Sequence, residues 1–123
     1  MITIISKEEP QSLNHIYKAR AIYAKGKPIA TVYLCPKAKK YKDDFRKIAA
    51  EQYKGDPIID DVRVKATCFF GTKRKKDIQN CLKVELDALN NLVWIDDSQI
   101  VELLIIKKYE KDNGGLVLEI ERI

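Results

Sequence analysis

The chain has 123 residues, of which 46% are hydrophobic and 33% are charged, and its formal net charge is +5. This composition excludes a disordered or fibrous protein, and the length predicts a single domain, residues 1–123, with a core of its own. The positive charge favours a polyanionic partner. Because there is no membrane-length apolar run and no basic leader before the first apolar residues, we expect a soluble cytoplasmic protein without a membrane partner.

The number and spacing of the cysteines indicate whether the chain forms disulfides or a zinc site. Cys35, Cys68 and Cys81 are odd in number and form no CxxC pair. This argues against a disulfide framework and against a thiolate zinc site. Each cysteine has apolar neighbours in the sequence, so we predict three reduced, buried thiols.

Strand and helix patterns cover most of the first half of the chain. Residues 1–6 are rich in β-branched side chains and predict a short strand. Residues 17–34 predict a hairpin. Pro36 suits the first turn of a helix, and apolar residues recur at helical spacing over residues 38–53. The expected core stripe of this helix is Tyr41, Phe45, Ile48, Ala49 and Gln52.

The second half predicts three strands and a helix. Residues 62–70 alternate apolar and other side chains, which indicates a strand with one buried face. Helical spacing predicts a second long helix over residues 77–93. The apolar run within residues 99–108 is typical of a central strand covered on both faces, and a turn then predicts a hairpin to a last strand, residues 116–123. The predicted fold class is α/β, of the α+β type, with a mixed sheet and two main helices.

The predicted hairpin interleaves aromatic and basic side chains. Aromatic rings between cations suit stacking on nucleic-acid bases while the cations hold phosphates. A half-buried hairpin whose tyrosines pack inward explains the same pattern, and the sequence leaves both interpretations open. The residues concerned are Tyr17, Tyr23 and Tyr33, with Lys18, Arg20, Lys25 and Lys27.

Acidic residues that could bind a metal ion, together with basic residues, follow residue 72 in the sequence. A basic run ends at Asp77, Lys83 lies on the polar side of the predicted helix, and Asp96 and Asp97 precede the next strand. Carboxylate oxygens are ligands for Mg²⁺, and a metal beside cations suits attack on a phosphodiester. Asp77 equally suits a helix cap, and the aspartate pair equally suits a turn cap. Because the predicted helix separates the acids, their convergence depends on sheet geometry or on a dimer.

Four segments in combination resemble the RusA family of Holliday junction resolvases. The run from Arg74 to Lys83 is similar to the family's basic stretch followed by D-x-D-N-x-x-K, and Asp87-Ala88-Leu89 matches its D-A-L. Trp94 to Val101 resembles its (W/I)-x-D-D-x-Q-(V/I) strand entry. The segment from Pro10 to Tyr17 resembles its P-x-S-x-N-x-x-Y opening. The resemblance covers nearly the whole chain.

The resemblance implies a small homodimeric endonuclease that makes paired symmetric nicks in four-way DNA junctions and depends on Mg²⁺, with Mn²⁺ as a substitute. It places such a protein at the nucleoid, in a cell or encoded by a phage. The catalytic residues that it implies are Asp77, Lys83 and Asp97, and the implied metal ligands are Asp77, Gln79, Asp96 and Asp97. The implied DNA contacts are Asn14, Tyr17, Lys73, Arg74, Lys75, Lys76 and Asn80.

One position departs from the family motif, because Gln79 stands where the second acid is expected. A glutamine oxygen can still bind a metal, but one negative charge is lost from the ligand set. We therefore expect weaker metal binding and cleavage than in relatives with both acids, while junction binding survives. A junction-binding protein without cleavage and a small α/β RNA-binding module are the alternatives that the sequence leaves open.

Overall fold

The computed structural model describes residues 1–11, 17–24, 27–72, 78 and 81–123, and within residues 17–34 it describes the backbone alone. The elements, in chain order, are β1 (Ile2–Ser6), β2 (Tyr17–Ala24), β3 (Lys27–Leu34), α2 (Pro36–Gln52), β4 (Val62–Phe70), α3 (Lys83–Ala88), the 3₁₀ turn η2 (Asp97–Gln99), β5 (Ile100–Tyr109) and β6 (Gly115–Arg122).

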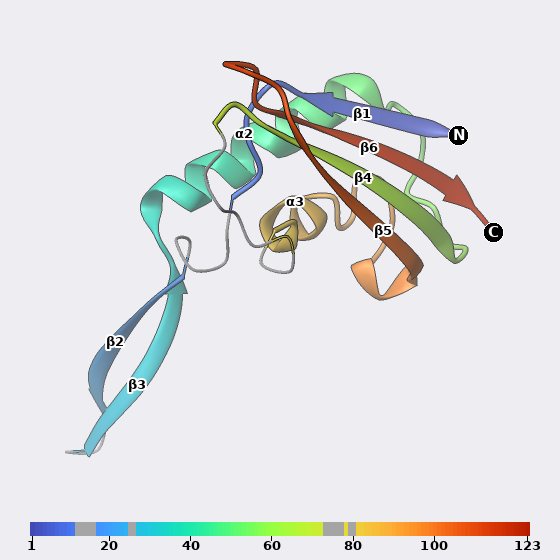
Figure 1. Ribbon diagram of the computed structural model, residues 1–123. Helices are drawn as coiled ribbons and strands as arrows, with labels where there is room; N and C mark the ends of the chain where they lie inside the picture. The colour runs from blue at the N-terminus through green and yellow to red at the C-terminus, as the bar shows by residue number, and fades with distance from the viewer. Residues whose placement is uncertain (12–16, 25–26, 73–77, 79–80) are drawn as a thin grey trace.

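Four strands form a mixed sheet in the order β1-β6-β4-β5 (Figure 1). Strand β6 is antiparallel to both β1 and β4, whereas β5 runs parallel to β4. Strands β2 and β3 pair with each other as an antiparallel hairpin and make a two-stranded sheet of their own. This arrangement confirms the predicted α+β class with a mixed sheet and two helices.

One face of the four-stranded sheet is packed and the other is open. Along β4, alternate residues from Val62 to Phe70 are buried, while Arg63 and Lys65 between them are exposed. The buried side chains join Phe45 of α2 and Leu86 of α3 in one core, so the two helices cover this face. Burial of that apolar surface is the main stabilising term for the domain. The three cysteines, all among the described residues, are buried thiols, as predicted.

Helix α2 is close to the predicted helix but differs in its core stripe. Pro36 occupies its first turn, and Ala38, Tyr41, Phe45 and Ala49 are buried. Gln52 was predicted to face the core and is exposed instead. Its side-chain amide accepts from the Ile5 N–H and donates to the Ile5 carbonyl, each at 2.8 Å. Gln52 therefore satisfies backbone groups of β1, the strand at one side of the sheet.

The predicted helix over residues 77–93 is wrong in extent, because α3 covers only six residues. Leu82 has φ 78° and Asn91 has φ 63°. Neither left-handed conformation fits inside a right-handed helix. The apolar stripe is nevertheless buried at Leu82, Leu86, Leu89 and Val93. A helical turn followed by a reverse turn buries the same side chains that one long helix would bury.

Strand β5 also differs from its prediction, since it lies at the side of the sheet and is not central. Leu103 is 44% exposed and Leu104 is 56% exposed. The predicted hairpin between the last two strands is wrong as well, because β4 lies between β5 and β6. Among the helices that the structure describes, none is long and apolar enough to cross a membrane.

Candidate active site

Helix α3 presents Lys83 at its first position. The Lys83 Nζ atom lies 3.1 Å from Asp87 Oδ1, one helical turn away, and the Lys83 side chain is 48% exposed. Spacing of four residues places both groups on the same side of the helix. Asp87 therefore orients an ammonium group that remains accessible from solvent, so the predicted role of Lys83 stays a prediction that this geometry allows.

Arg46 of α2 holds the other end of α3. Its Nη1 atom donates to the Ala88 carbonyl at 2.6 Å and to the Asn90 carbonyl at 2.8 Å. Carbonyl groups at a helix C-terminus lack partners within the helix, and a cation there also complements the helix dipole. Arg46 thus fixes the helix that carries Lys83. The sequence pattern gave no sign of this contact, because Arg46 lies outside the apolar stripe of its helix.

The turn before β5 separates the roles of the two adjacent aspartates. The Asp96 carboxylate accepts from the Ser98 N–H at 3.0 Å. In return, the Gln99 side-chain oxygen accepts from the Asp96 N–H at 2.9 Å, which completes a capping box. The hydrogen bonds from Ser98 hold the pKa of the Asp96 carboxyl below its ordinary value. Gln99 also donates to the carbonyls of Ile58 and Asp60, so the turn is anchored to the body.

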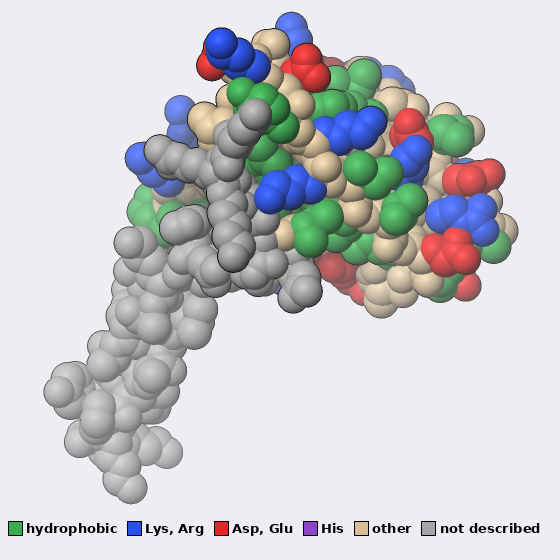
Figure 2. Space-filling model, in the orientation of Figure 1, with side chains coloured by type: hydrophobic (Ala, Val, Ile, Leu, Met, Phe, Trp, Pro, Cys, Tyr) green, Lys and Arg blue, Asp and Glu red, His purple; other side chains and the backbone are tan. Residues whose placement is uncertain are grey.

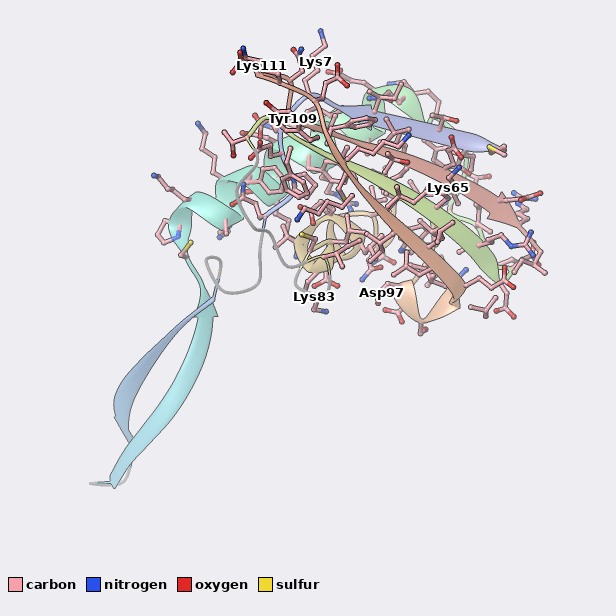
Figure 3. All side chains as sticks on the ribbon, in the orientation of Figure 1. Lys7, Lys65, Lys83, Asp97, Tyr109 and Lys111 are labelled. Atoms are coloured by element: carbon pink, nitrogen blue, oxygen red, sulfur yellow. The ribbon has the colours of Figure 1, made fainter. Side chains whose placement is uncertain are left out.

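Asp97 begins the 3₁₀ turn, and its side chain is partly exposed. In Figure 3 the side chains of Lys83 and Asp97 both lie at the lower rim of the domain, Lys83 on α3 and Asp97 at the entry to β5. A carboxylate oxygen at such a position fits a hard cation. The cap engages one oxygen of Asp96, whose side chain is exposed, so both aspartates stay candidate ligands.

Glu85 is a buried acid that the sequence analysis missed. It is fully buried on α3, and its Oε1 atom accepts from the Gln11 N–H at 3.0 Å. Burial raises its pKa, although the hydrogen bond from Gln11 offsets part of that effect. The pKa of the Tyr41 hydroxyl is also raised. Burial is the largest cause, and the nearby Glu85 is the next. A signal was present, because position 85 lies three residues after Leu82 and four before Leu89, within the apolar stripe.

Several predicted site residues lie outside the described part of the chain: Asn14, Lys73, Arg74, Lys75, Lys76, Asp77, Gln79 and Asn80. Tyr17 opens β2, where only the backbone is described. Among the described residues, no three His, Cys, Asp or Glu side chains gather closely enough to hold a metal ion. Of the predicted metal ligands, the structure therefore describes Asp96 and Asp97 but not Asp77 and Gln79.

The charge on the body of the domain is mixed. Figure 2 shows cationic and acidic side chains interspersed with apolar ones over the visible face of the sheet. Arg63 of β4 illustrates this, since it pairs with Glu102 and lies 3.5 Å from Glu121. Exposed lysines occur both on the first turns of α2, at Lys37, Lys39 and Lys40, and along or beside the sheet, at Lys65, Lys107, Lys108 and Lys111. On the sheet they alternate with acids, whereas the first turn of α2 has no acidic residue.

Comparison with known proteins decides the family. The model of the family described as endodeoxyribonuclease RusA matches residues 13–121. This chain belongs to the RusA family. The match confirms the resemblance found in the sequence, and it spans Lys83, Asp97 and the region between them.

Curated relatives of this RusA family member carry the name crossover junction endodeoxyribonuclease RusA. The protein from Aquifex aeolicus (strain VF5) is 37% identical over 71 residues, which are 57% of this chain and 56% of that protein. The proteins from Escherichia coli (strain K12) and Enterobacteria phage 82 are each 27% identical over 81 residues, 65% of this chain and 68% of theirs. The chain thus spans little more than half of the Aquifex relative.

Proposed function

We propose that this chain is a structure-selective DNA endonuclease that resolves four-way junctions by paired symmetric nicking. The observation that carries the proposal is the family match over residues 13–121, because it includes the candidate site at Lys83 and Asp97. The relatives named crossover junction endodeoxyribonuclease supply the substrate class. The exposed ammonium and carboxylate at the rim of the domain are the chemistry that such a substrate requires.

We assign Asp77, Gln79 and Asp97 to an Mg²⁺ ion, with Mn²⁺ as a substitute. The oxygen-only donors suit a hard cation, and Asp97 is supported by its partly exposed carboxylate. Asp96 is the weaker ligand because its carboxylate already accepts from Ser98. When bound, such an ion polarises a phosphate oxygen and lowers the pKa of a coordinated water.

Lys83 is assigned to the negative charge that develops on the phosphate during cleavage. A preoriented cation stabilises that charge without reorganising as the reaction proceeds. The contact with Asp87 at 3.1 Å limits the positions of the Lys83 ammonium group. Asp87 is therefore a positioning residue for Lys83.

DNA binding is assigned to the basic run Lys73, Arg74, Lys75 and Lys76, with further contacts from Asn14, Tyr17 and Asn80. Cations on phosphates give affinity that is independent of base sequence and sensitive to salt. A four-way junction is distinguished from duplex DNA by the directions of its arms and not by its bases.

We propose that the active form is a homodimer that uses β5. Among the strands that the structure describes, none pairs with the outer side of β5. The strand exposes Val101, Leu103 and Leu104, and such an unprotected apolar edge favours pairing with another chain. Antiparallel pairing of two β5 strands has two-fold symmetry, which suits two equivalent cuts. The exposure of these apolar side chains is the observation that favours this strand.

Gln79 sets the expected level of activity. With one carboxylate fewer, the assigned ligand set binds Mg²⁺ less tightly, so cleavage is slower than with an acid at this position. Junction binding depends on the basic residues and is retained. A binding protein without cleavage is the second candidate function, and Gln79 is the observation that favours it.

The test is nicking of a labelled, mobile four-way junction with Mg²⁺ or Mn²⁺, compared with a linear duplex. Wild-type protein, Gln79→Asp and Gln79→Asp with Lys83→Ala are measured in parallel. We expect symmetric cuts that are faster in Gln79→Asp and are abolished by the lysine change. Tight junction binding without cuts by any variant would support the binding protein. Preference for single-stranded RNA over the junction would overturn both and favour an RNA-binding module.

A further inference from the structure

Two carboxylates in this chain hold backbone amides that are distant in sequence. The Gly71 N–H donates to Glu9 Oε1 at 2.7 Å, and the Gln11 N–H donates to Glu85 Oε1 at 3.0 Å. Hydrogen bonds to an ionised acceptor are shorter and stronger than neutral ones. The residues just after β1 are therefore joined both to the end of β4 and to α3.

The Glu9 contact depends on a glycine. A methyl group on Gly114 would lie 2.1 Å from Glu9 Cγ, so the Glu9 side chain passes directly over the Gly114 α-carbon. The Gly71 carbonyl accepts from the Asp112 N–H at 3.1 Å, on the same loop as Gly114. Gly71 is thus held from both sides at the point where β4 has just ended.

The Glu85 contact is made inside the protein. Glu85 is fully buried and lies two residues after Lys83 on α3. Its Oε2 atom and the Tyr41 hydroxyl have no hydrogen-bond partner within the described residues. Burial of a carboxylate is costly unless hydrogen bonds or a cation compensate. The hydrogen bond from the Gln11 N–H supplies part of that compensation.

The two contacts lie next to both predicted DNA-binding segments. Gln11 directly precedes residues 12–16, which include Asn14, and Gly71 precedes the run 73–77 by two positions. We propose that Glu9 and Glu85 are positioning residues that fix Gly71 and Gln11, the described residues beside the two segments, relative to Lys83, and so determine selectivity for junctions over duplex DNA. This inference rests on the proposed function. Fixed relative positions reduce the ordering cost on binding a substrate of one shape, whereas duplex DNA gains less from them.

The test uses variants that remove each contact in different ways. Glu9→Ala and Glu85→Leu remove the acceptor, and Gly114→Ala displaces Glu9 without changing any charge. Glu9→Gln and Glu85→Gln keep an accepting oxygen and serve as rescue variants. Glu8→Ala is the matched control, because it removes the same charge from the exposed neighbouring residue.

Two quantities are measured for each variant: hydrogen exchange of the Gln11 and Gly71 amides, and the ratio of duplex to junction dissociation constants. We expect exchange of the released amide to rise roughly 10- to 100-fold, which corresponds to the loss of one charge-assisted hydrogen bond. We expect the selectivity ratio to fall by about tenfold in the three disrupting variants. The two rescue variants and Glu8→Ala should keep the wild-type ratio.

The outcomes separate the two proposals. If the wild-type protein distinguishes junction from duplex and the disrupting variants do so equally well, the positioning role is overturned while the proposed function stands. If Glu8→Ala lowers the ratio as much as Glu9→Ala, the effect is one of charge, and the positioning role is again overturned. A wild-type protein that binds junction and duplex equally overturns the proposed function and the inference together.

Discussion

The Asp96 carboxylate caps the η2 turn, while Asp97, one position later, starts the turn with a partly exposed side chain. At the scale of the residue, the surroundings of each carboxylate decide what it can bind, although all three side chains carry the same chemical group. Asp96 is engaged with the Ser98 amide, and Glu85 is an acid without solvent contact. Each case leads to a prediction.

Asp96 and Asp97 should respond differently to substitution. In the Gln79→Asp background, Asp97→Asn should lower junction cleavage by roughly 100-fold or more, because a ligand charge is lost. Its melting temperature should stay close to that of the parent. Asp96→Ala should retain most cleavage but lower the melting temperature, because the cap is removed. Cleavage assays and thermal unfolding check both, and equal loss of cleavage in the two variants would contradict this division of roles.

Glu85 should make stability depend on pH in an unusual direction. Its pKa in the folded protein is raised by burial. The folded state therefore binds the proton more tightly than the unfolded state, and stability falls as pH rises from about 4, the ordinary range of glutamic acid, toward the raised pKa. The titratable groups facing it are Tyr41 and Cys68, whose pKa values are also raised by burial, so both stay neutral in this range.

Glu85→Gln removes the ionisation and keeps an accepting oxygen for Gln11. The difference in unfolding free energy, variant minus wild type, should therefore increase with pH across that window. Urea unfolding at a series of pH values measures it. A difference that is constant with pH would show that Glu85 titrates normally.

At the scale of the element, α3 is too short to be stable alone. A six-residue helix has few internal hydrogen bonds, so tertiary contacts must hold it in place. Arg46 supplies such a contact from α2 at the C-terminal end. At the other end Leu82 takes a left-handed conformation and its side chain enters the core. The position of Lys83 thus depends on residues of another helix.

Arg46→Met should lower the unfolding free energy by roughly 2 kcal/mol, because it keeps the aliphatic stem but removes charge-assisted hydrogen bonds to two carbonyls. Denaturant unfolding gives this value. Lys47→Met, on the exposed side of the same helix, is the control and should change stability by less than about 0.5 kcal/mol. Similar losses in both variants would mean that general charge, and not the contact with α3, is responsible.

At the scale of the whole molecule, the two sides of the sheet differ. Gln52 covers backbone groups of β1, whereas β5 exposes apolar side chains. A hollow over the open face is lined by Leu103 and Leu104 of β5, by residues of β4 and β6, and by Met1. The difference between the two edges is the reason for proposing β5 as the dimer strand.

The wild-type protein should have a solution mass of twice the 14.2 kDa chain. The double change Leu103→Lys, Leu104→Lys should produce monomers, because charged side chains block pairing of strand edges. Sedimentation equilibrium measures the masses. Ile59→Lys, at an apolar residue that is 80% exposed elsewhere on the surface, is the control and should remain dimeric. Dimers of undiminished affinity in the double variant would exclude this surface.

Local patterns determined several features from the sequence alone. The alternation from Val62 to Phe70 predicts β4 with its buried face, because successive side chains of a strand point to opposite sides. Pro36 and the spacing of Tyr41, Phe45 and Ala49 predict α2 in the same way. Four segments of the sequence in combination resemble the RusA family, and the family match confirms that resemblance.

The tertiary structure decided the features that depend on partners distant in sequence. An apolar run such as that of β5 specifies a strand, but its burial depends on which strands lie beside it, and β4 separates it from β6. The stripe from Leu82 to Val93 specifies burial, but a short helix and a turn satisfy it as well as a long helix. Asp96 differs from Asp97, and Glu9 and Glu85 become positioning residues, only because folding brings Ser98, Gly71 and Gln11 to their carboxylates. Sequence periodicity reports which side chains are buried, whereas hydrogen bonds across the chain require the packed structure.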